Sequence, residues 1–331
     1  LNPMPAKLDP SIMSSSEFAD LIGLKEDSRK ERIFLNMAFH TIKQKEKEEY
    51  KEYRGKRFVE TVRDLISEWV NNSVVGWEVK YYNHIKNKYD NRKLDKEDTD
   101  ILLTVLDTIA NFESGFSANI TEGDIIENFQ RGKLNIIDLS GFEVNQMIAL
   151  VSYIAKQLLT KRILYAKSKR DLYHHDEKIR SSARNTAYQL ESKFPALTKP
   201  IVMIVEEAHI YIPKNKETDA SYWLGKIARE GRKFGVGLGI ITQQPKKLNE
   251  DVLSQTNTKV ILRIVEPEDQ KYIQKASEDL GEDLVKDLAS LGIGEAVITG
   301  TAIKLPAIVK IDRFDGAYGG EDINIYEEWN E

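Results

Sequence analysis

The sequence predicts an α/β protein, with a mostly parallel sheet in its second part and an all-α helical bundle ahead of it. Two observations support this fold class. From about residue 133, short apolar segments alternate with helical ones, which is typical of a parallel sheet covered on both faces. Before that point the chain is highly charged and follows helical spacing, and no segment of it reads as a good strand.

The first third is expected to be a bundle of helices with solvated charged faces. Serines begin the apolar-periodic segment 14–24, where their hydroxyls can cap a helix. Segment 56–70 places six large apolar residues on one helical stripe: Phe58, Val59, Val62, Leu65, Ile66 and Trp69. A further helix is predicted over 95–112. The charged run 43–57 interleaves Lys and Glu, so we interpret it as a solvated helix rather than as a DNA-binding site.

The second part alternates strands with helices. Apolar strands are predicted within 133–141, 201–205, 236–245, 258–264, 294–300 and 305–311. Helices are predicted at about 144–169, 220–234 and 266–278, and the polar stretch 171–195 is an excursion with some helix. In parallel sheets, chemistry lies at the carboxyl ends of the strands, which is where Asp138, Glu206, Glu207 and Gln243 fall.

Composition narrows the classes of function. A net charge of −5 and a pI near 5.8 argue against a uniformly basic surface that coats nucleic acid, although a local basic groove or pore is compatible with them. The absence of cysteine excludes a disulfide scaffold, Cys-based zinc sites and a thiol nucleophile, and it fits a reducing cytoplasm. No apolar run has the length of a membrane span, so no membrane partner is expected.

Two adjacent carboxylates follow the strand at 201–205. This pattern is typical of a Walker B strand, in which the first acid, Glu206, holds Mg²⁺ through water and the second, Glu207, orients or deprotonates the attacking water. The alternative is a buried strand that simply runs into a surface loop. His209 raises the possibility of a metalloprotease, but the sequence contains no H-E-x-x-H motif.

Two further residues fit phosphoryl transfer. Arg232, at the end of the helix predicted around 220–234 and flanked by glycines, is suited to reach a neighbouring subunit and neutralise charge on the transferred phosphate. Its alternative role is to interact with the helix dipole. Gln243 ends the next buried strand, where it could bind the γ-phosphate or the attacking water; alone it would be an ordinary strand end.

Three segments together resemble the HerA family of hexameric DNA-translocating ATPases, relatives of FtsK: "IVMIVEEAHIYIP", "IAREGRKFGVGLGIITQQPKKLNEDVLSQTNTKVILRI" and "LGIGEAVITG". The resemblance is dense across about residues 133–311, and the helical first third matches the family's helical insertion by position. It implies a RecA-like P-loop NTPase core, ATP and Mg²⁺ as cofactors, and a homo-hexamer that pumps double-stranded DNA. It also implies a NurA-type nuclease as partner, in the resection of DNA ends for recombinational repair in archaea.

The resemblance also assigns roles to residues. Glu206 matches the acid that holds Mg²⁺, Glu207 the catalytic base, Gln243 the γ-phosphate sensor and Arg232 the finger that acts on a neighbouring subunit. Arg229 is a second, weaker match for the finger. Arg263 is a possible further nucleotide contact, or else a surface residue at a strand end. The pore of such a ring needs DNA-facing loops, for which the candidates are Lys214, Lys216, Lys246 and Lys247.

The sequence departs from the family in one respect. Its three Gly-Lys pairs, at residues 55, 132 and 225, lack both the upstream glycine and the following hydroxyl residue of a phosphate-binding G-x-x-x-x-G-K-[ST] loop. We therefore expect a C-terminal portion of a HerA-like protein, weakly active or inactive by itself. The expected domains are a helical insertion at 1–125, the ATPase core at 126–312 and a tail at 313–331.

Other functions stay open from the sequence alone. One is a ring-forming scaffold that activates a partner nuclease or a defence effector. Another is a related DNA-pumping ATPase of conjugation or chromosome partition. A motor and a scaffold differ in whether the Glu207→Gln substitution abolishes their function.

Overall fold

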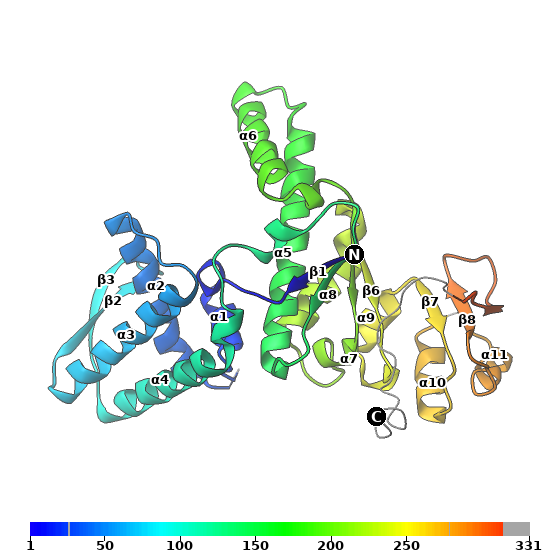
Figure 1. The fold of residues 1–331 in the computed structure, drawn as a ribbon, viewed down its shortest axis with the longest axis horizontal. Coiled ribbons are helices and arrows are strands. Elements are labelled where there is room, and N and C mark those ends of the chain that lie inside the picture. The colour runs from blue at the N-terminus through cyan, green and yellow to red at the C-terminus, as the bar shows by residue number, and fades with distance from the viewer. Residues whose placement is uncertain (26, 278, 314–331) are drawn as a thin grey trace, which may run out of the picture. The chain divides into compact units, whose positions relative to one another are not determined.

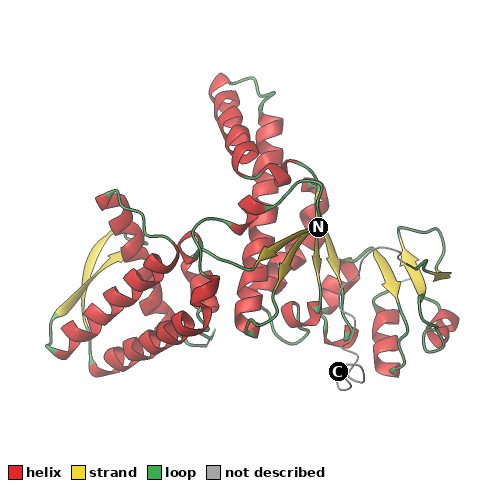
Figure 2. Ribbon diagram, in the orientation of Figure 1, coloured by secondary structure: helices red, strands yellow, loops and turns green. Residues whose placement is uncertain are grey.

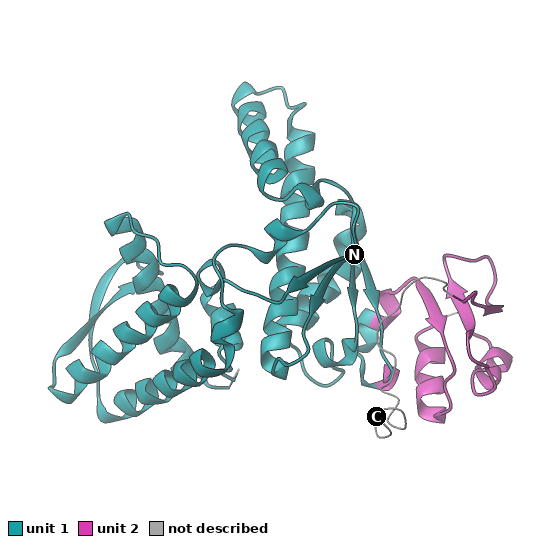
Figure 3. Ribbon diagram, viewed as in Figure 1, with its two compact units in different colours: residues 1–243, 247–252 teal, residues 244–246, 253–331 magenta. Residues whose placement is uncertain are grey.

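The computed structural model describes residues 1–25, 27–277 and 279–313, which form two compact units (Figure 3). The first unit comprises residues 1–243 and 247–252. The second comprises residues 244–246 and the described residues from 253 onward. Except for Arg313, the predicted tail 313–331 lies outside the described residues. The predicted boundaries at 125 and 312 stay predictions.

Helices dominate the first part of the first unit, as the sequence predicted (Figure 1). They are α1 (Ser15–Leu21), α2 (Arg29–Glu49), α3 (Gly55–Val74) and α4 (Lys96–Phe116). Ser14 caps α1 by a capping box, in which its hydroxyl accepts the Glu17 N–H and the Glu17 carboxylate accepts the Ser14 N–H. All six residues of the predicted stripe on α3 are buried.

The first third also contains a β-hairpin, so the expectation of no strand there was wrong. Strands β2 (Glu78–Asn83) and β3 (Lys88–Lys93) pair antiparallel, and Asn87 adopts a left-handed conformation in the turn between them. Tertiary contacts stabilise β2: Val79 is fully buried, and the Tyr82 N–H donates to the Thr41 hydroxyl on α2 at 2.8 Å. The hairpin escaped prediction because its strands are rich in Lys, Asp and Asn, which β-propensity disfavours.

The first unit contains two parallel strand pairs, each a two-stranded sheet, besides the β2–β3 hairpin (Figure 2). Strand β1 (Asn2–Pro5) pairs with β4 (Asn135–Asp138), so the first residues of the chain share a sheet with residues beyond the helical region. Strand β5 (Ile201–Val205) pairs with β6 (Val236–Ile240), with Val205 opposite Ile240. The prediction of parallel strands is confirmed for β4, β5 and β6, whereas β1 was not among the predicted strands.

The helices that accompany this sheet are α5 (Val144–Asp171), α6 (Glu177–Lys193), α7 (Ala208–Tyr211) and α8 (Asp219–Glu230). Helices α5 and α8 pack on each other and both contact β6. Side chains alternate along β5: Ile201 and Met203 pack against the hydrophobic core, while Val202 and Ile204 are exposed.

The second unit contains an antiparallel sheet. Its strands are β7 (Thr258–Ile261), β8 (Glu295–Gly300) and β9 (Ala307–Lys310), in the order β7-β8-β9. Only six residues join β8 to β9, too few for the crossover that parallel strands require, so these late strands depart from the parallel pattern. The helices are α10 (Pro267–Lys275) and α11 (Glu282–Asp287), and α9 (Glu250–Gln255) begins in the first unit and ends in the second. No described helix is long and apolar enough to cross a membrane.

Candidate active site

The carboxyl ends of β5 and β6 bring three of the predicted residues to one edge of the sheet. Hydrogen bonding continues past the strands, because the Ile241 N–H donates to Val205 O at 2.9 Å and the Ala208 N–H donates to Ile241 O at 3.0 Å. These bonds hold Glu206 and Glu207 beside the segment that leads into Gln243. The backbone therefore brings Glu206 and Glu207 close to the segment that carries Gln243, as the sequence predicted.

Glu207 has a strained backbone. Its φ of 48° and ψ of 42° lie in the left-handed region, which costs a residue with a Cβ about 1–2 kcal/mol. This conformation turns the chain from β5 directly into the one-turn helix α7. Strain of this kind persists where the surrounding structure enforces it, and it is concentrated at functional sites.

The Glu207 carboxylate is part of a small polar cluster. Its Oε2 lies 3.3 Å from His209 Nδ1, and the same nitrogen lies 3.1 Å from Thr242 Oγ1. The cluster thus joins the residues that follow β5 to those that follow β6. The His209 side chain is 14% exposed and that of Glu207 44% exposed, so a supported carboxylate faces solvent.

His209 and Thr242 are functional candidates that sequence reasoning missed. The sequence raised His209 only as a metal ligand, whereas the structure places it as a partner of Glu207. The sequence did contain a clue to this role, because His209 lies two residues after Glu207. Thr242 immediately precedes the predicted Gln243, but only the strand pairing shows that it meets His209.

A buried tyrosine lies behind the carboxylate. Burial raises the pKa of Tyr211, and the negative charge of Glu207 raises it further. The Tyr211 carbonyl accepts hydrogen bonds from the hydroxyls of Thr218, at 2.7 Å, and Ser221, at 3.0 Å. Thr218 caps α8, so the turn after Glu207 is tied to the start of that helix.

Glu206 is exposed at the same edge and makes no hydrogen bond or ion pair with a described residue. Among the described residues, no group of three or more His, Cys, Asp or Glu could hold a metal ion by itself. One accessible carboxylate nonetheless fits Mg²⁺, which retains several waters and takes its remaining ligands from substrate phosphates. Gln243 is also exposed.

Arg232 lies at the opposite edge of the sheet. It sits in a 3₁₀ turn, Gly231–Phe234, that precedes the amino end of β6. The five residues of β6 separate this turn from the carboxylates by about 16 Å along the strand. The Arg232 side chain is exposed and pairs with no described residue. It therefore does not meet Glu206 or Glu207 within one subunit.

The turn that carries Arg232 depends on two glycines and on Arg162. A side chain at Gly231 would collide with Val236 O, and Gly235 adopts a left-handed conformation, with φ 72°, that favours glycine. Arg162 on α5 is buried, and its guanidinium donates to Phe234 O at 2.8 Å and to Leu197 O at 2.7 Å. Burial lowers the pKa of Arg162. Nothing in the sequence marked Arg162, because its role depends on segments distant along the chain.

The two other predicted arginines differ in setting. Arg229 lies near the end of α8, and a Cβ on Gly225 would meet its Nη1 at 3.2 Å, so the guanidinium lies over its own helix. Arg263 is exposed just beyond β7 and belongs to the second unit.

The four lysines that were predicted to contact DNA lie in three different environments. Lys214 and Lys247 are exposed and adjacent, since the Lys214 N–H donates to Lys247 O at 2.8 Å. Lys246 is paired with Glu268 at 3.2 Å, which raises the pKa of the lysine. Lys216 lines a separate pocket.

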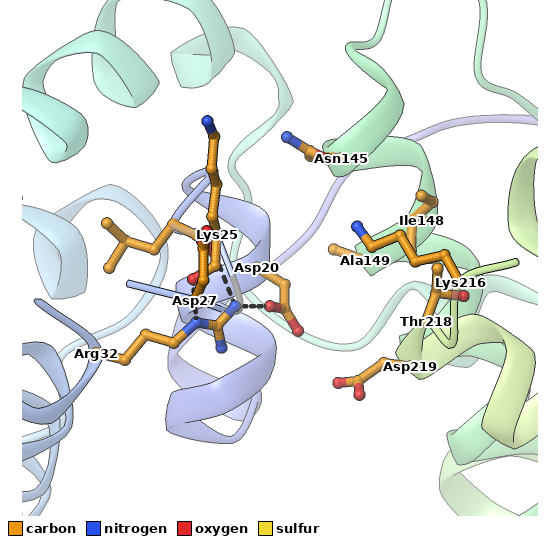
Figure 4. Close-up of a pocket in the computed structure, with 11 residues that line it drawn as sticks. Asp20, Lys25, Asp27, Arg32, Asn145, Ile148, Ala149, Lys216, Thr218 and Asp219 are labelled. Carbon is orange, nitrogen blue, oxygen red and sulfur yellow. Dashed lines mark hydrogen bonds and ion pairs between the residues drawn. The ribbon is translucent and has the colours of Figure 1, made fainter. Parts of the chain in front are cut away.

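That pocket has a volume of about 410 Å³ and lies between α1, the start of α2 and the first turns of α5 and α8 (Figure 4). Arg32 makes an ion pair with Asp20, and Asp219 projects toward Asp20 from α8. Burial, and secondarily the nearby Asp219 carboxylate, raise the pKa of Asp20 to about 6, although Arg32 opposes this shift. Apart from Lys216, none of the predicted site residues lines the pocket.

The parallel strands, with acids and a glutamine after their carboxyl ends, have the fold of a RecA-like P-loop NTPase core. Consistent with this fold, the structure of VirB4 of Thermoanaerobacter pseudethanolicus superposes with a TM-score of 0.55 at 12% identity, covering 95% of this chain and 74% of that one. At this identity the likeness concerns the fold alone.

The chain belongs to the HerA helicase family. A family model described as "Helicase HerA, central domain" matches residues 1–158, and one described as "Helicase HerA-like C-terminal" matches residues 194–314. The probable DNA double-strand break repair helicase HerA of Methanocaldococcus jannaschii is 55% identical over 99% of this chain. The DNA double-strand break repair helicase HerA of Pyrococcus furiosus is 40% identical over 100% of it. The chain spans 64% and 60% of the lengths of these two relatives.

Proposed function

We propose that this chain forms the motor core of a HerA-type helicase, which hydrolyses ATP to move double-stranded DNA during repair of double-strand breaks. The observation that carries the proposal is the strained Glu207, held against His209 and Thr242 at the carboxyl edge of β5 and β6. The relatives' names supply the DNA substrate and the repair process.

The proposed chemistry assigns a task to each residue at this edge. Glu207 accepts a proton from the water that attacks the γ-phosphorus, as the bond from that phosphorus to the β-phosphate oxygen breaks. His209 and Thr242 hold the Glu207 side chain in place. Gln243 donates to the γ-phosphate or orients the water. Glu206 would hold Mg²⁺ through water, and the ion would neutralise charge on the β- and γ-phosphates when bound.

Two parts of the proposed active site, the phosphate-binding loop and the arginine finger, are not supplied by the 331 residues of the same subunit. The phosphate-binding loop is absent from the 331-residue sequence, so we assign the phosphate cradle to a segment of a longer protein. Arg232 projects from the opposite edge of the sheet, so we assign it to the active site of a neighbouring copy in a homo-hexamer. We propose a NurA-type nuclease as the partner protein. We also propose that the protein acts in the cytoplasm.

The test is DNA-stimulated ATP hydrolysis, measured for the chain and for a longer version that restores the phosphate-binding segment. The longer protein should hydrolyse ATP faster in the presence of duplex DNA. Its Glu207→Gln variant should lose about 10²–10⁴-fold in turnover, the usual contribution of a general base. The 331-residue chain alone should show little turnover.

Glu206→Gln serves as an internal comparison, because loss of a carboxylate that holds Mg²⁺ should raise the Mg²⁺ concentration needed for half-maximal turnover. A Glu207→Gln protein that keeps parental turnover would contradict the assignment of the base. A variant that loses turnover but still activates a nuclease partner would favour the scaffold function over the motor.

A further inference from the structure

The helical hairpin of residues 161–193, formed by the second half of α5 and by α6, carries a surplus of positive charge. It contains nine Lys and Arg against four Asp and Glu, a surplus of five, in a chain whose net charge is −5. The surplus is therefore local to this hairpin rather than a property of the composition. In Figure 1 the hairpin extends away from the sheet and the helical bundle of the first unit.

Several of these cations are available to a partner. Lys167 and Lys178 are exposed, and neither makes an ion pair with a described residue. Arg184 is 67% exposed and has only a long contact, 3.9 Å, to Glu177. Arg180, in contrast, is occupied in building the tip, where its guanidinium pairs with Glu177 and donates to His174 O at 3.0 Å.

The rest of the α6 surface is suited to a polar partner. This 17-residue helix buries only Ala183 and Ala187, and it packs on α5 and on the turn that follows it. Its exposed surface presents hydroxyl and amide groups from Ser181, Ser182 and Asn185. Two exposed tyrosines accompany them: Tyr173 at the end of α5, 91% exposed, and Tyr188 on α6, 72% exposed.

We propose that this hairpin contacts the sugar–phosphate backbone of duplex DNA. Lysine, arginine, serine, asparagine and tyrosine are the residues that bind phosphate oxygens, and such contacts do not depend on base sequence. The inference rests on the proposed function, because that function supplies DNA as the substrate.

The position of the hairpin separates DNA contact from hydrolysis. The hairpin leads into the amino end of β5, whereas Glu206 and Glu207 follow its carboxyl end. The hairpin therefore adds a DNA contact at the sheet edge opposite to the carboxylates. The loops with Lys214 and Lys247 lie at the carboxyl edge itself.

The test is a titration of fluorescently labelled, random-sequence duplex DNA, followed by anisotropy at several salt concentrations. Lys167→Glu with Lys178→Glu should weaken binding about tenfold or more near 0.1 M salt, and should reduce the slope of log affinity against log salt by about two. The matched control is Lys47→Glu with Lys51→Glu, two exposed lysines of the charged run 43–57. It changes the net charge equally and should stay within about twofold of the parent.

Circular dichroism and thermal melting establish that each variant is folded. If the glutamates disturb the hairpin, the same two lysines changed to alanine provide a milder test, with a smaller loss in the same direction. If the hairpin variants bind DNA as tightly as the parent, the inference is overturned while the proposed function stays intact. The basic face of the hairpin would then suit an acidic protein surface. Failure of the parent to bind duplex DNA would contradict the proposed function as well.

Discussion

The two edges of the β5–β6 pair differ in charge and in the way their functional side chains are held. At the carboxyl edge, Glu206 and Glu207 face solvent, and Glu207 is supported by a strained backbone and by His209. At the amino edge, Arg232 faces solvent from a turn that Arg162 anchors through two carbonyl groups. One edge presents acids and the other presents a cation.

The separation of these groups bears on assembly. Parallel strands place their two ends at opposite edges of a sheet, so no side-chain rotation brings Arg232 to Glu207 in the same subunit. Complementary groups on opposite edges suit a head-to-tail contact, in which the amino edge of one copy meets the carboxyl edge of the next. A head-to-tail contact produces a ring where its rotation closes, as the proposed hexamer requires. The predictions below test this difference between the edges, from the largest effect to the smallest.

The largest effect is expected from Arg232→Ala in the longer protein that carries the phosphate-binding segment. Loss of a finger that neutralises the transferred phosphate should lower turnover about 10³-fold. Arg229→Ala distinguishes the two finger candidates: because its side chain lies over Gly225 on its own helix, it should lower turnover far less than Arg232→Ala. Steady-state ATP hydrolysis measures both.

Mixing experiments sharpen this prediction. Arg232→Ala and Glu207→Gln subunits should each be nearly inactive alone, but a mixed ring would contain some sites with an intact Glu207 from one subunit and an intact Arg232 from the next. Turnover should therefore rise on mixing. A mixture no more active than its components would contradict a finger supplied by a neighbouring copy.

The second prediction concerns Asp20, in the pocket near the starts of α5 and α8. Asp20 has its pKa raised from 3.8 to about 6, so the folded state disfavours its ionised form. Stability from this group is therefore present below pH 4 and is lost as the pH rises toward 6, by about 3 kcal/mol at most. Asp20→Asn should remove this loss, so the variant should gain stability relative to the parent between pH 4 and pH 7.

Urea unfolding at several pH values measures the difference. Asp64→Asn is a suitable control, because that carboxylate is exposed on α3 and its change should shift stability little at any pH. A parent-to-variant difference that is constant from pH 4 to pH 7 would show that Asp20 does not titrate in this range.

The third prediction concerns the anchor of the Arg232 turn. Arg162→Met should cost about 2 kcal/mol of stability, because the carbonyls of Phe234 and Leu197 lose a charged donor in a buried site. Arg162→Lys keeps the charge but not the planar fork that reaches both carbonyls, so an intermediate loss is expected. Urea unfolding measures both. Equal stability of the methionine variant and the parent would exclude an anchoring role.

The sequence predicted features that depend on local pattern. The apolar strand that ends before Glu206 and Glu207, the stripe on α3 and the parallel direction of β5 and β6 follow from residue spacing and from alternation of strands with helices. These patterns act over a few residues, so they can be read without knowing the tertiary structure.

The features that were missed depend on segments that meet only in the folded chain. The polar hairpin β2–β3 is stabilised by Thr41 on α2, and His209 meets Thr242 only because β5 and β6 pair. Arg162 reaches a carbonyl 72 residues away. The left-handed backbone of Glu207 is also invisible in the sequence, because glutamate is not a residue that favours this conformation.

The smallest predicted effect tests that conformation directly. At φ 48°, glycine carries no Cβ penalty, so Glu207→Gly should be about 1 kcal/mol more stable than Glu207→Ala, although both lack the carboxylate and should be inactive. At Glu206, which is not left-handed, the order should reverse, because glycine there only adds conformational freedom to the unfolded chain. Urea unfolding of the four variants gives the two differences. If alanine is the more stable at both positions, the backbone at Glu207 is not strained, and the carboxylate needs no support from its surroundings to face the attacking water. If glycine is the more stable at residue 207 and alanine at residue 206, the backbone at Glu207 is strained. The protein then loses some stability to hold this one carboxylate in its place.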